Sequence, residues 1–224
     1  MGQGAMLTLA DVLEAEDVAR IREALAQAPW RDGRRTAGAA ARKVKANSQA
    51  DADNPKIAAL ARFVREALER NEVFAAYARP ARWSTLMFNR YGPGETYGSH
   101  MDDALMGPEG ARVRTDLSFT LFLSDPSTYE GGELVVEGVE GERAVKLPAG
   151  SMVVYSTGAL HRVEPVTSGE RLACVGWIQS FIRRADEREI LFDLARVRGA
   201  LPEGEARLLL DKASGNLLRL WGEP

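Results

Sequence analysis

The chain has 224 residues, enough for one core domain with helical additions, and its 45% hydrophobic and 27% charged residues favour a buried core over disorder. A formal net charge of -3 gives no electrostatic reason to expect a nucleic-acid partner. The single cysteine, Cys174, excludes an intramolecular disulfide and a multi-thiolate metal site, so any metal must rest mainly on nitrogen and oxygen ligands.

The N-terminus lacks the features of a targeting segment. It has no basic stretch followed by a long apolar run, and no part of the chain approaches the roughly 20 apolar residues of a membrane span. We therefore expect no secretory signal, no membrane partner and a cytoplasmic location. The residues before Met6 carry no weight in the fold prediction.

Residues 1–80 form a predicted N-terminal helical region. The first helix has an apolar stripe at helical spacing: Val18, Ile21, Leu25 and Ala28. Asn54 and Pro55 are typical of the N-cap and first residue of a second helix. Its stripe consists of Ile57, Leu60, Ala61, Val64 and Leu68. Segment 31–51 between the helices is basic, rich in small residues and without periodicity, so we predict a loop or irregular edge there.

Residues 81–182 change to short strands separated by turns. The predicted strands are 83–91, 96–102, 116–123, 132–137, 144–147, 151–155, 161–166 and 171–181. Clusters of glycine, proline, serine and aspartate mark the breaks between them. Short strands with no helical pattern among them predict an antiparallel sandwich or barrel rather than an α/β fold.

Residues 183–224 return to helical periodicity and form a predicted C-terminal extension. One stripe consists of Ile190, Leu191, Leu194 and Val197. A further helix is predicted over 208–221, with Gly215 as a candidate break. The sequence shows no internal repeat, low-complexity tract or coiled-coil heptad.

Both histidines of the chain stand where a mononuclear metal site needs them. Asp102 follows His100 by two residues, and such residues of a strand share a face, so both side chains can converge on one ion. His161 is the only histidine left for a third ligand. Two imidazoles and one carboxylate form the facial triad of non-haem Fe(II) oxygenases, which leaves positions open for a 2-oxo acid and O2.

A chance pattern is the alternative, since a lone His-x-Asp arises often. His100 would then be a polar loop residue and His161 a satisfied strand histidine. Asp103 beside the motif would point to the opposite face and is predicted to be solvated.

Arg171 follows His161 by ten residues. A 2-oxoglutarate bound through its keto-acid end presents a second carboxylate, which an Arg fork can hold bidentately while staying charged when buried. The turn Thr167-Ser168-Gly169 is expected to fold Arg171 onto the strand next to that of His161. The alternative is a surface arginine paired with Glu170 or Glu164.

Three aromatic residues are candidates for the pocket wall. Trp177 lies six residues beyond Arg171, hence on the same strand face, and could limit water entry. Tyr91 and Tyr97 flank a glycine-rich turn before His100, and either hydroxyl could reach the co-substrate or substrate. A core role is the alternative for all three, because strand aromatics are commonly structural.

Four long runs of the sequence occur together, in the same order, in one known family. The runs are FNRYGPGETYGSHMDDA, RTDLSFTLFLSDPSTYEGGELVVE, KLPAGSMVVYSTGALHRVEPVTSGERLACVGWIQS and LFDLARVRGAL. They resemble the bacterial PKHD-type hydroxylases, relatives of prolyl 4-hydroxylase, over nearly the whole chain. The resemblance implies a mainly β fold: a double-stranded β-helix (jelly-roll) core with N-terminal and C-terminal α-helices packed on it.

The resemblance also implies cofactors and residue roles. The cofactors are Fe(II), 2-oxoglutarate, O2 and L-ascorbate, the last as the reductant that rescues oxidised iron. The family's iron ligands correspond to His100, Asp102 and His161. Arg171 corresponds to the 2-oxoglutarate anchor, and Tyr91 and Trp177 correspond to pocket-lining, cofactor-binding positions.

The sequence shares a glycine pair with the family and departs from the family pattern at two places. Gly131-Gly132 resembles the family's pair before a core strand. Gly176 stands where a bulky aromatic is expected before Trp177, and segment 35–45 is looser than the family's pattern. Both departures affect pocket shape, and therefore the substrate, more than the chemistry.

These observations predict a dioxygenase that hydroxylates an unactivated C–H while 2-oxoglutarate is decarboxylated to succinate. The substrate partner is an unidentified peptide or small molecule; prolyl is the family label. One alternative is an iron-responsive binding protein linked to iron uptake or homeostasis. Another is a Zn(II) hydrolase, because two histidines and an aspartate also bind zinc. A hydrolase has no need of a buried anchor such as Arg171.

Overall fold

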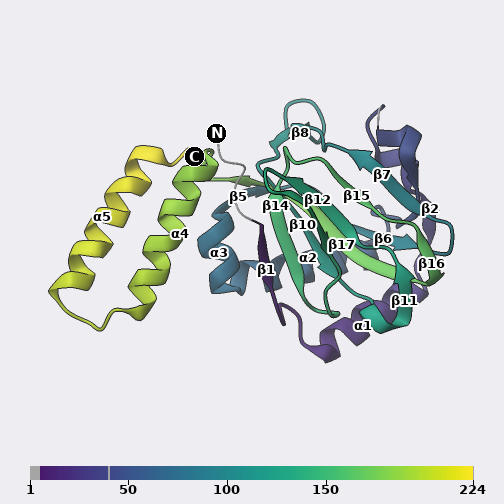
Figure 1. Cartoon of the computed structure of the whole chain (residues 1–224), viewed down its shortest axis with the longest axis horizontal. Coiled ribbons are helices and arrows are strands. Elements are labelled where there is room, and N and C mark those ends of the chain that lie inside the picture. The colour runs from purple at the N-terminus through teal and green to yellow at the C-terminus, as the bar shows by residue number, and fades with distance from the viewer. Residues whose placement is uncertain (1–5, 40, 224) are drawn as a thin grey trace.

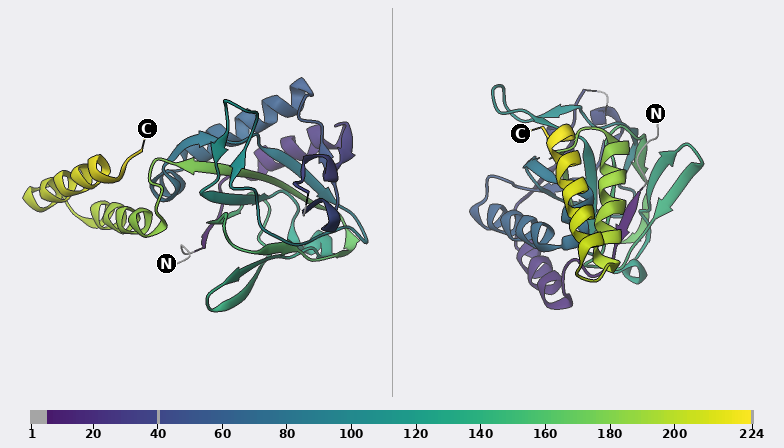
Figure 2. Two further views of the ribbon diagram at one scale, coloured as in Figure 1. Left: turned by 90° about the horizontal axis from the view of Figure 1, so that it is seen from above. Right: turned by 90° about the vertical axis from the view of Figure 1, so that its left-hand side faces the viewer.

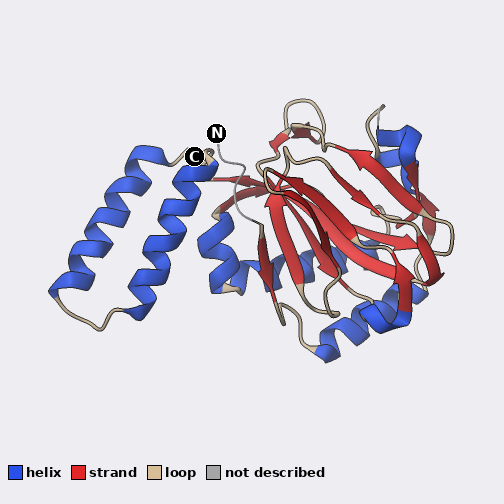
Figure 3. Ribbon diagram, viewed as in Figure 1, coloured by secondary structure: helices blue, strands red, loops and turns tan. Residues whose placement is uncertain are grey.

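Two facing antiparallel sheets form the centre of the computed structural model, which describes residues 6–39 and 41–223 (Figures 1 and 3). The larger sheet comprises β1 (Leu7–Leu9), β14 (Met152–Ser156), β10 (Leu117–Phe122), β17 (Arg171–Ser180), β6 (Met87–Tyr91), β4 (Ser48–Ala50) and β2 (Trp30–Asp32), in that order, with β5 (Pro80–Trp83) also paired to β17. The smaller comprises β13 (Gly141–Val145), β12 (Leu134–Gly138), β15 (His161–Val163), β7 (Thr96–His100) and β3 (Lys45–Ala46). Two ribbons pair β8 (Leu105–Met106) with β9 (Val113–Arg114) and β11 (Tyr129–Gly131) with β16 (Val166–Gly169). The predicted antiparallel β core is confirmed.

Alternation along the strands divides the core into two layers. On β10, Phe119 and Leu121 join the cluster shared with the helices, whereas Phe122 joins the cluster between the sheets. Leu134 of the smaller sheet and Tyr155 of the larger meet in this second cluster. All six residues of β10 are buried, so the strand is covered on both faces.

Helices α1 (Ala15–Ala26), α2 (Pro55–Arg70) and α3 (Glu72–Ala78) cover the outer face of the larger sheet (Figure 1). The predicted stripe of α1 is buried through Val18, Ile21 and Leu25. Helix α2 begins as predicted, since the Asn54 side chain accepts a hydrogen bond from the Lys56 N–H at 2.9 Å. The predicted N-terminal helices are therefore confirmed.

Segment 31–51, predicted as a loop or irregular edge, is an irregular edge. This segment forms β2, two 3₁₀ turns (η1, Gly33–Thr36, and η2, Ala41–Val44), β3 and β4. Strand β3 joins the smaller sheet through β7, and β4 joins the larger sheet through β6, so the segment connects the edges of both sheets. Strands of two or three residues are too short to display alternation, so no periodic pattern in the sequence indicates them.

Three of the predicted core strands differ from the structure in how they divide or where they end. The predicted strand 83–91 divides into β5 and β6, and 96–102 ends at His100. The predicted strand 161–166 stops at Val163, and Pro165 has no N–H with which to continue the ladder. The strand bounds predicted from the sequence are therefore inexact at these three places.

Helices α4 (Ala185–Ala200) and α5 (Glu205–Trp221) form a hairpin that projects from one end of the sandwich (Figures 1 and 2). Helix α4 contacts α3, where the rings of Tyr77 and Phe192 meet edge to face at 5.3 Å. Helix α5 packs against α4 and continues through Gly215, so the candidate break is wrong. One glycine in a leucine-rich helix costs only about 1 kcal/mol.

Among the described residues, no helix has the length and apolar character needed to span a bilayer. Residues 1–5, which carried no weight in the fold prediction, lie outside the described residues.

Candidate active site

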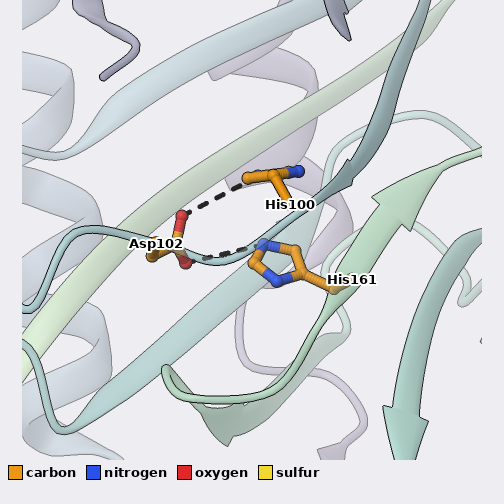
Figure 4. A group of neighbouring side chains, drawn as sticks. All are labelled: His100, Asp102 and His161. Atoms are coloured by element: carbon orange, nitrogen blue, oxygen red, sulfur yellow. Dashed lines mark ion pairs between the residues drawn. The ribbon is translucent and has the colours of Figure 1, made fainter. Parts of the chain in front are cut away.

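His100, Asp102 and His161 lie together, as the spacing predicts (Figure 4). His100 ends β7 and His161 begins β15, and the two stand opposite each other in the ladder. One ligand atom from each residue lies within 4.8 Å of the others. Asp102 stands two residues beyond the end of β7, so it reaches the histidines from a loop and not by the strand alternation that was expected.

The hydrogen bonds of the two imidazoles fix which nitrogen faces Asp102. His100 Nδ1 lies 2.8 Å from the Gly98 carbonyl oxygen, and His161 Nδ1 lies 3.0 Å from that of Ala159. A carbonyl oxygen only accepts, so both Nδ1 atoms carry a hydrogen, and it is Nε2 of each ring that faces Asp102 and is available as a metal ligand. These Nε2 atoms lie 3.9 Å and 3.5 Å from the Asp102 carboxylate oxygens.

The protonation state of His100 suits a ligand. Burial, followed by the neighbouring His161, lowers the pKa of His100 to about 4, which leaves the ring neutral at pH 7. Aromatic rings enclose the pair: Tyr97 stacks on His100 at 3.6 Å, and Tyr155 meets His161 edge to face at 5.2 Å. The imidazoles are therefore held in orientation from both sides.

A hydroxyl from the opposite sheet orients the Asp102 carboxylate. Ser118 Oγ donates to Asp102 Oδ2 at 2.9 Å and lies 3.0 Å from Thr157 Oγ1. The single Ser118 hydrogen goes to the carboxylate, so Thr157 is the donor in the second contact. Two imidazole nitrogens and one oriented carboxylate fit the ligand set of a ferrous facial triad.

Arg171 lies on β17 in the larger sheet, not on a strand beside that of His161, so that part of the prediction is wrong. After β16 the chain crosses at Gly169, whose φ is 75°, and β17 pairs with β6 and β10. The segment expected to serve as the connecting turn instead forms the ribbon with β11.

The guanidinium of Arg171 is buried, with only 1% of the residue exposed. Its central carbon lies 5.3 Å from the ring centres of both Tyr91 and Phe122. Within the described ranges it forms no salt bridge, because Glu170 pairs with Arg90 and Glu164 pairs with Arg162. The surface ion pair considered from the sequence is therefore wrong, and a buried cation remains for an anionic partner.

The glycine pair before β12 makes room for Arg171. Gly131 and Gly132 have φ values of 70° and 66°, a region that favours glycine. A Cβ on Gly132 would lie 3.0 Å from Arg171 Cδ. The pair thus lets the Arg171 side chain pass close to the backbone.

One cavity between the sheets brings all six predicted site residues together. It encloses about 740 Å³ of empty space, mouth included, and is lined by residues that include His100, Asp102, His161, Arg171, Tyr91 and Trp177. The Trp177 Nε1 is buried there without a hydrogen-bond partner among the described residues. Asp103 is exposed at the cavity's edge, as predicted.

The absence of an aromatic side chain at Gly176 has a steric cause. A Cβ at this position would lie 2.7 Å from the ring of Phe119, which already fills the space. The Gly176 backbone lies opposite Phe119 in the β17–β10 ladder. The departure noted in the sequence is thus compensated by the neighbouring strand.

Several cavity residues were missed from the sequence. They are Lys45, Gln49, Asn89, Ser118, Thr120 and Tyr155. For Ser118 and Thr120 a signal existed: two hydroxyls at i and i+2 in the apolar run LSFTLF mark one polar face. For Lys45 and Gln49 no signal existed, because their strands are too short to show a period.

Comparison with known proteins identifies the family of this chain. Residues 86–179 match the family model described as the 2OG-Fe(II) oxygenase superfamily. A PKHD-type hydroxylase of Hyphomonas neptunium is 46% identical over 97% of this chain and 100% of its own, and one of Maricaulis maris is 48% identical over 97% and 99%.

A solved structure shares the fold. A prolyl hydroxylase from Trichoplax adhaerens, in complex with a hypoxia inducible factor oxygen degradation domain peptide fragment, matches with a TM-score of 0.59 and 12% identity, over 84% of this chain and 87% of that one. The predicted jelly-roll core with terminal helices is confirmed. The chain therefore belongs to the PKHD-type hydroxylases of the 2OG-Fe(II) oxygenase superfamily and is an iron- and 2-oxoglutarate-dependent oxygenase.

Proposed function

We propose that His100, Asp102 and His161 hold Fe(II), and that Arg171 binds the distal carboxylate of 2-oxoglutarate in the same cavity. The observation that carries this proposal is the pairing of a converging His-Asp-His cluster with a buried guanidinium that has no carboxylate partner. When bound, the iron supplies the activation of O2, coupled to decarboxylation of 2-oxoglutarate to succinate and CO2.

The surrounding residues position these groups and exclude water. The carbonyl bonds at Nδ1 keep both imidazoles from rotating, and Ser118 holds Asp102 in one orientation. Tyr91 lies beside the guanidinium of Arg171; burial raises its pKa to about 12, with Arg171 acting in the opposite direction, so its hydroxyl stays a donor at pH 7. We assign Tyr91 as a second contact of the co-substrate and Trp177 as the wall that limits water entry.

The proposed reaction is hydroxylation of an unactivated C–H. Prolyl is our first candidate, because the Trichoplax adhaerens protein of this fold is a prolyl hydroxylase. We infer that O2 is the oxidant and that L-ascorbate restores the ferrous state after uncoupled turnover. The binding-protein alternative is not favoured, since the relatives are hydroxylases, and a zinc hydrolase leaves the buried Arg171 without a role.

The experiment loads the chain with Fe(II) and 2-oxoglutarate without oxygen, and then admits air with candidate substrates. A weak visible absorption band is expected on loading, and succinate should form in step with a product heavier by one oxygen atom in mass spectrometry. His161→Ala should abolish both the band and turnover. Arg162→Ala is the matched control, since Arg162 is the next residue and its ion pairs with Glu142 and Glu164 lie outside the cavity lining.

Two results would contradict the proposal. One is a folded, iron-loaded sample that shows no absorption band with 2-oxoglutarate. The other is a His161→Ala variant that retains turnover equal to that of the Arg162→Ala control.

A further inference from the structure

Lys45 is a second cation of the cavity that the iron and co-substrate positions do not use. It begins β3, opposite Tyr97 in the ladder, and only 6% of it is exposed. Its Nζ lies 4.9 Å from the centre of the Tyr97 ring, which in turn stacks 3.6 Å from His100. The ammonium therefore lies one aromatic ring away from the proposed iron ligands.

No carboxylate of the residues that the structure describes lies within salt-bridge distance of the Lys45 ammonium, and Asp102 and Asp32 attract it only from farther away. In the described part of the chain it forms no salt bridge, and its hydrogen bond to Thr36 Oγ1 is long, at 3.4 Å. Lys146 offers a comparison: it donates to two carbonyl oxygens at 2.9 and 3.0 Å and lies 3.7 Å from Glu133. A buried ammonium so sparsely bonded is costly unless an anion pairs with it.

The neighbouring wall of the cavity also offers donors. Gln49 is fully engaged: its Oε1 accepts from Thr36 at 2.6 Å and its Nε2 donates to Asn89 Oδ1 at 2.8 Å. With that oxygen used, the Nδ2 of Asn89 is left to donate, and Asn89 lines the cavity. Lys45, Thr36, Gln49 and Asn89 form a polar wall without a carboxylate, which suits an anionic ligand.

The co-substrate does not account for Lys45. In the proposed function its keto-acid end lies at the iron and its distal carboxylate at Arg171, which is on the larger sheet. Lys45 is on the smaller sheet, in segment 31–51. A cation separate from both positions is available to the substrate.

We propose that Lys45 binds a carboxylate of the substrate, so that the enzyme oxidises a C–H in a molecule with a free carboxylate near the reacting carbon. This inference rests on the proposed function, which assigns Arg171 to 2-oxoglutarate. The carboxylate belongs to a free amino acid, to the C-terminus of a peptide or to another small organic acid. These sources share one chemistry and are separated by the probes below.

The test is anaerobic titration calorimetry on the chain loaded with Fe(II) and saturating 2-oxoglutarate. The probes are three matched pairs of acid and amide: L-proline and L-prolinamide, the peptide Ala-Ala-Pro-Ala with a free and an amidated C-terminus, and benzoic acid and benzamide. We expect at least one acid to bind about ten-fold or more tightly than its amide, the size of one hydrogen bond between charged groups. The pair with the largest preference identifies the source of the carboxylate.

Variants of Lys45 test whether this residue causes the preference for the acid over the amide. Lys45→Met removes the charge at nearly the same length and should abolish the preference, whereas Lys45→Arg keeps the charge and should retain it. Lys43→Met is the matched control, because Lys43 is exposed and two residues away. Thermal unfolding of each variant shows that it is folded.

Three results would overturn the inference. The first is that no acid binds at concentrations up to about 10 mM, a range that detects even weak ion pairing, and the second is that acids and amides bind equally. The third is that Lys45→Met lowers the affinity for 2-oxoglutarate more than it lowers the affinity for the probes. The last result would assign Lys45 to the co-substrate. If the chain fails to bind iron and 2-oxoglutarate at all, the proposed function fails, and that failure is seen before any probe is added.

Discussion

Replacing Ser118 by alanine tests whether the hydroxyl from the larger sheet sets the affinity of the metal site. Ser118 is 2% exposed, and its hydrogen bond to Asp102 Oδ2 fixes the orientation of the carboxylate between the two imidazoles. A hydrogen bond to a charged group contributes about 1.5–3 kcal/mol, and partners of metal ligands change affinity by about 10–100-fold. We therefore expect Ser118→Ala to raise the dissociation constant for Fe(II) by about 10–100-fold.

The assay is anaerobic competition for Fe(II) against a chromophoric chelator, with thermal unfolding of the metal-free protein measured in parallel. Ser124→Ala is the matched control. Ser124 is 1% exposed, donates to the Glu170 carbonyl at 2.9 Å and accepts from the Leu172 N–H at 2.8 Å, but it does not line the cavity. Both variants should lose stability, by about 1–3 kcal/mol, because each removes one partner of a buried group.

Only Ser118→Ala should lose metal affinity. Equal iron affinity in the two variants would refute the reasoning, since the hydroxyl would then serve packing alone. A loss of affinity as large in Ser124→Ala would refute it as well, because the effect would then follow from general destabilisation.

Three further predictions concern the anchors of the cavity. Arg171→Met should raise the KM for 2-oxoglutarate about 100-fold or more, because two charge-assisted hydrogen bonds are lost, while direct titration finds iron affinity unchanged. Gly132→Ala should lower the free energy of unfolding, measured with denaturant, by about 1–3 kcal/mol because of strain at positive φ. It should also lower the affinity for 2-oxoglutarate, because the new Cβ displaces Arg171. A variant with unchanged stability and affinity would contradict this. Burial lowers the pKa of Lys45 to about 8, with Asp102 and then Asp32 acting in the opposite direction. Its ammonium is present below that pH and lost above it, so carboxylate probes should bind about ten-fold more weakly for each pH unit above 8, and a flat profile in calorimetry would count against Lys45 as the partner.

The cluster that we propose as the iron ligands was predictable because the residue types are scarce and specific. With two histidines in the chain, His100 and His161 had no competitors for a shared site. His100 and Asp102 do converge as predicted, but not because they share a strand face, since Asp102 lies beyond the end of β7. Ligand chemistry thus constrained the site more strongly than local backbone geometry did.

The sheet that carries Arg171 was not predictable, because pairing between strands depends on contacts far apart in the sequence. Alternation correctly gave Arg171 and Trp177 the same face, which is a local property of one strand. The β11–β16 ribbon that diverts the chain before Arg171 has no local signature.

The burial of Lys45 had no signal in the sequence either. Lysine is almost always exposed, so its residue type argued against an internal position. Strand β3 holds only Lys45 and Ala46 and shows no period. The sequence therefore could not predict that Lys45, which we assign to the substrate, lines the cavity.

The placement of the two anchors on opposite sheets makes the sandwich a molecular ruler. His100 and His161 belong to the smaller sheet and Arg171 to the larger, and facing sheets pack about 10 Å apart. The span between the iron and the guanidinium is thus set by side chains such as Phe122 and Leu134 that separate the sheets, and not by a loop. Enlarging or trimming these spacers should shift the preferred length of the 2-oxo diacid by one carbon, toward 2-oxoadipate or oxaloacetate, while the iron ligands stay the same.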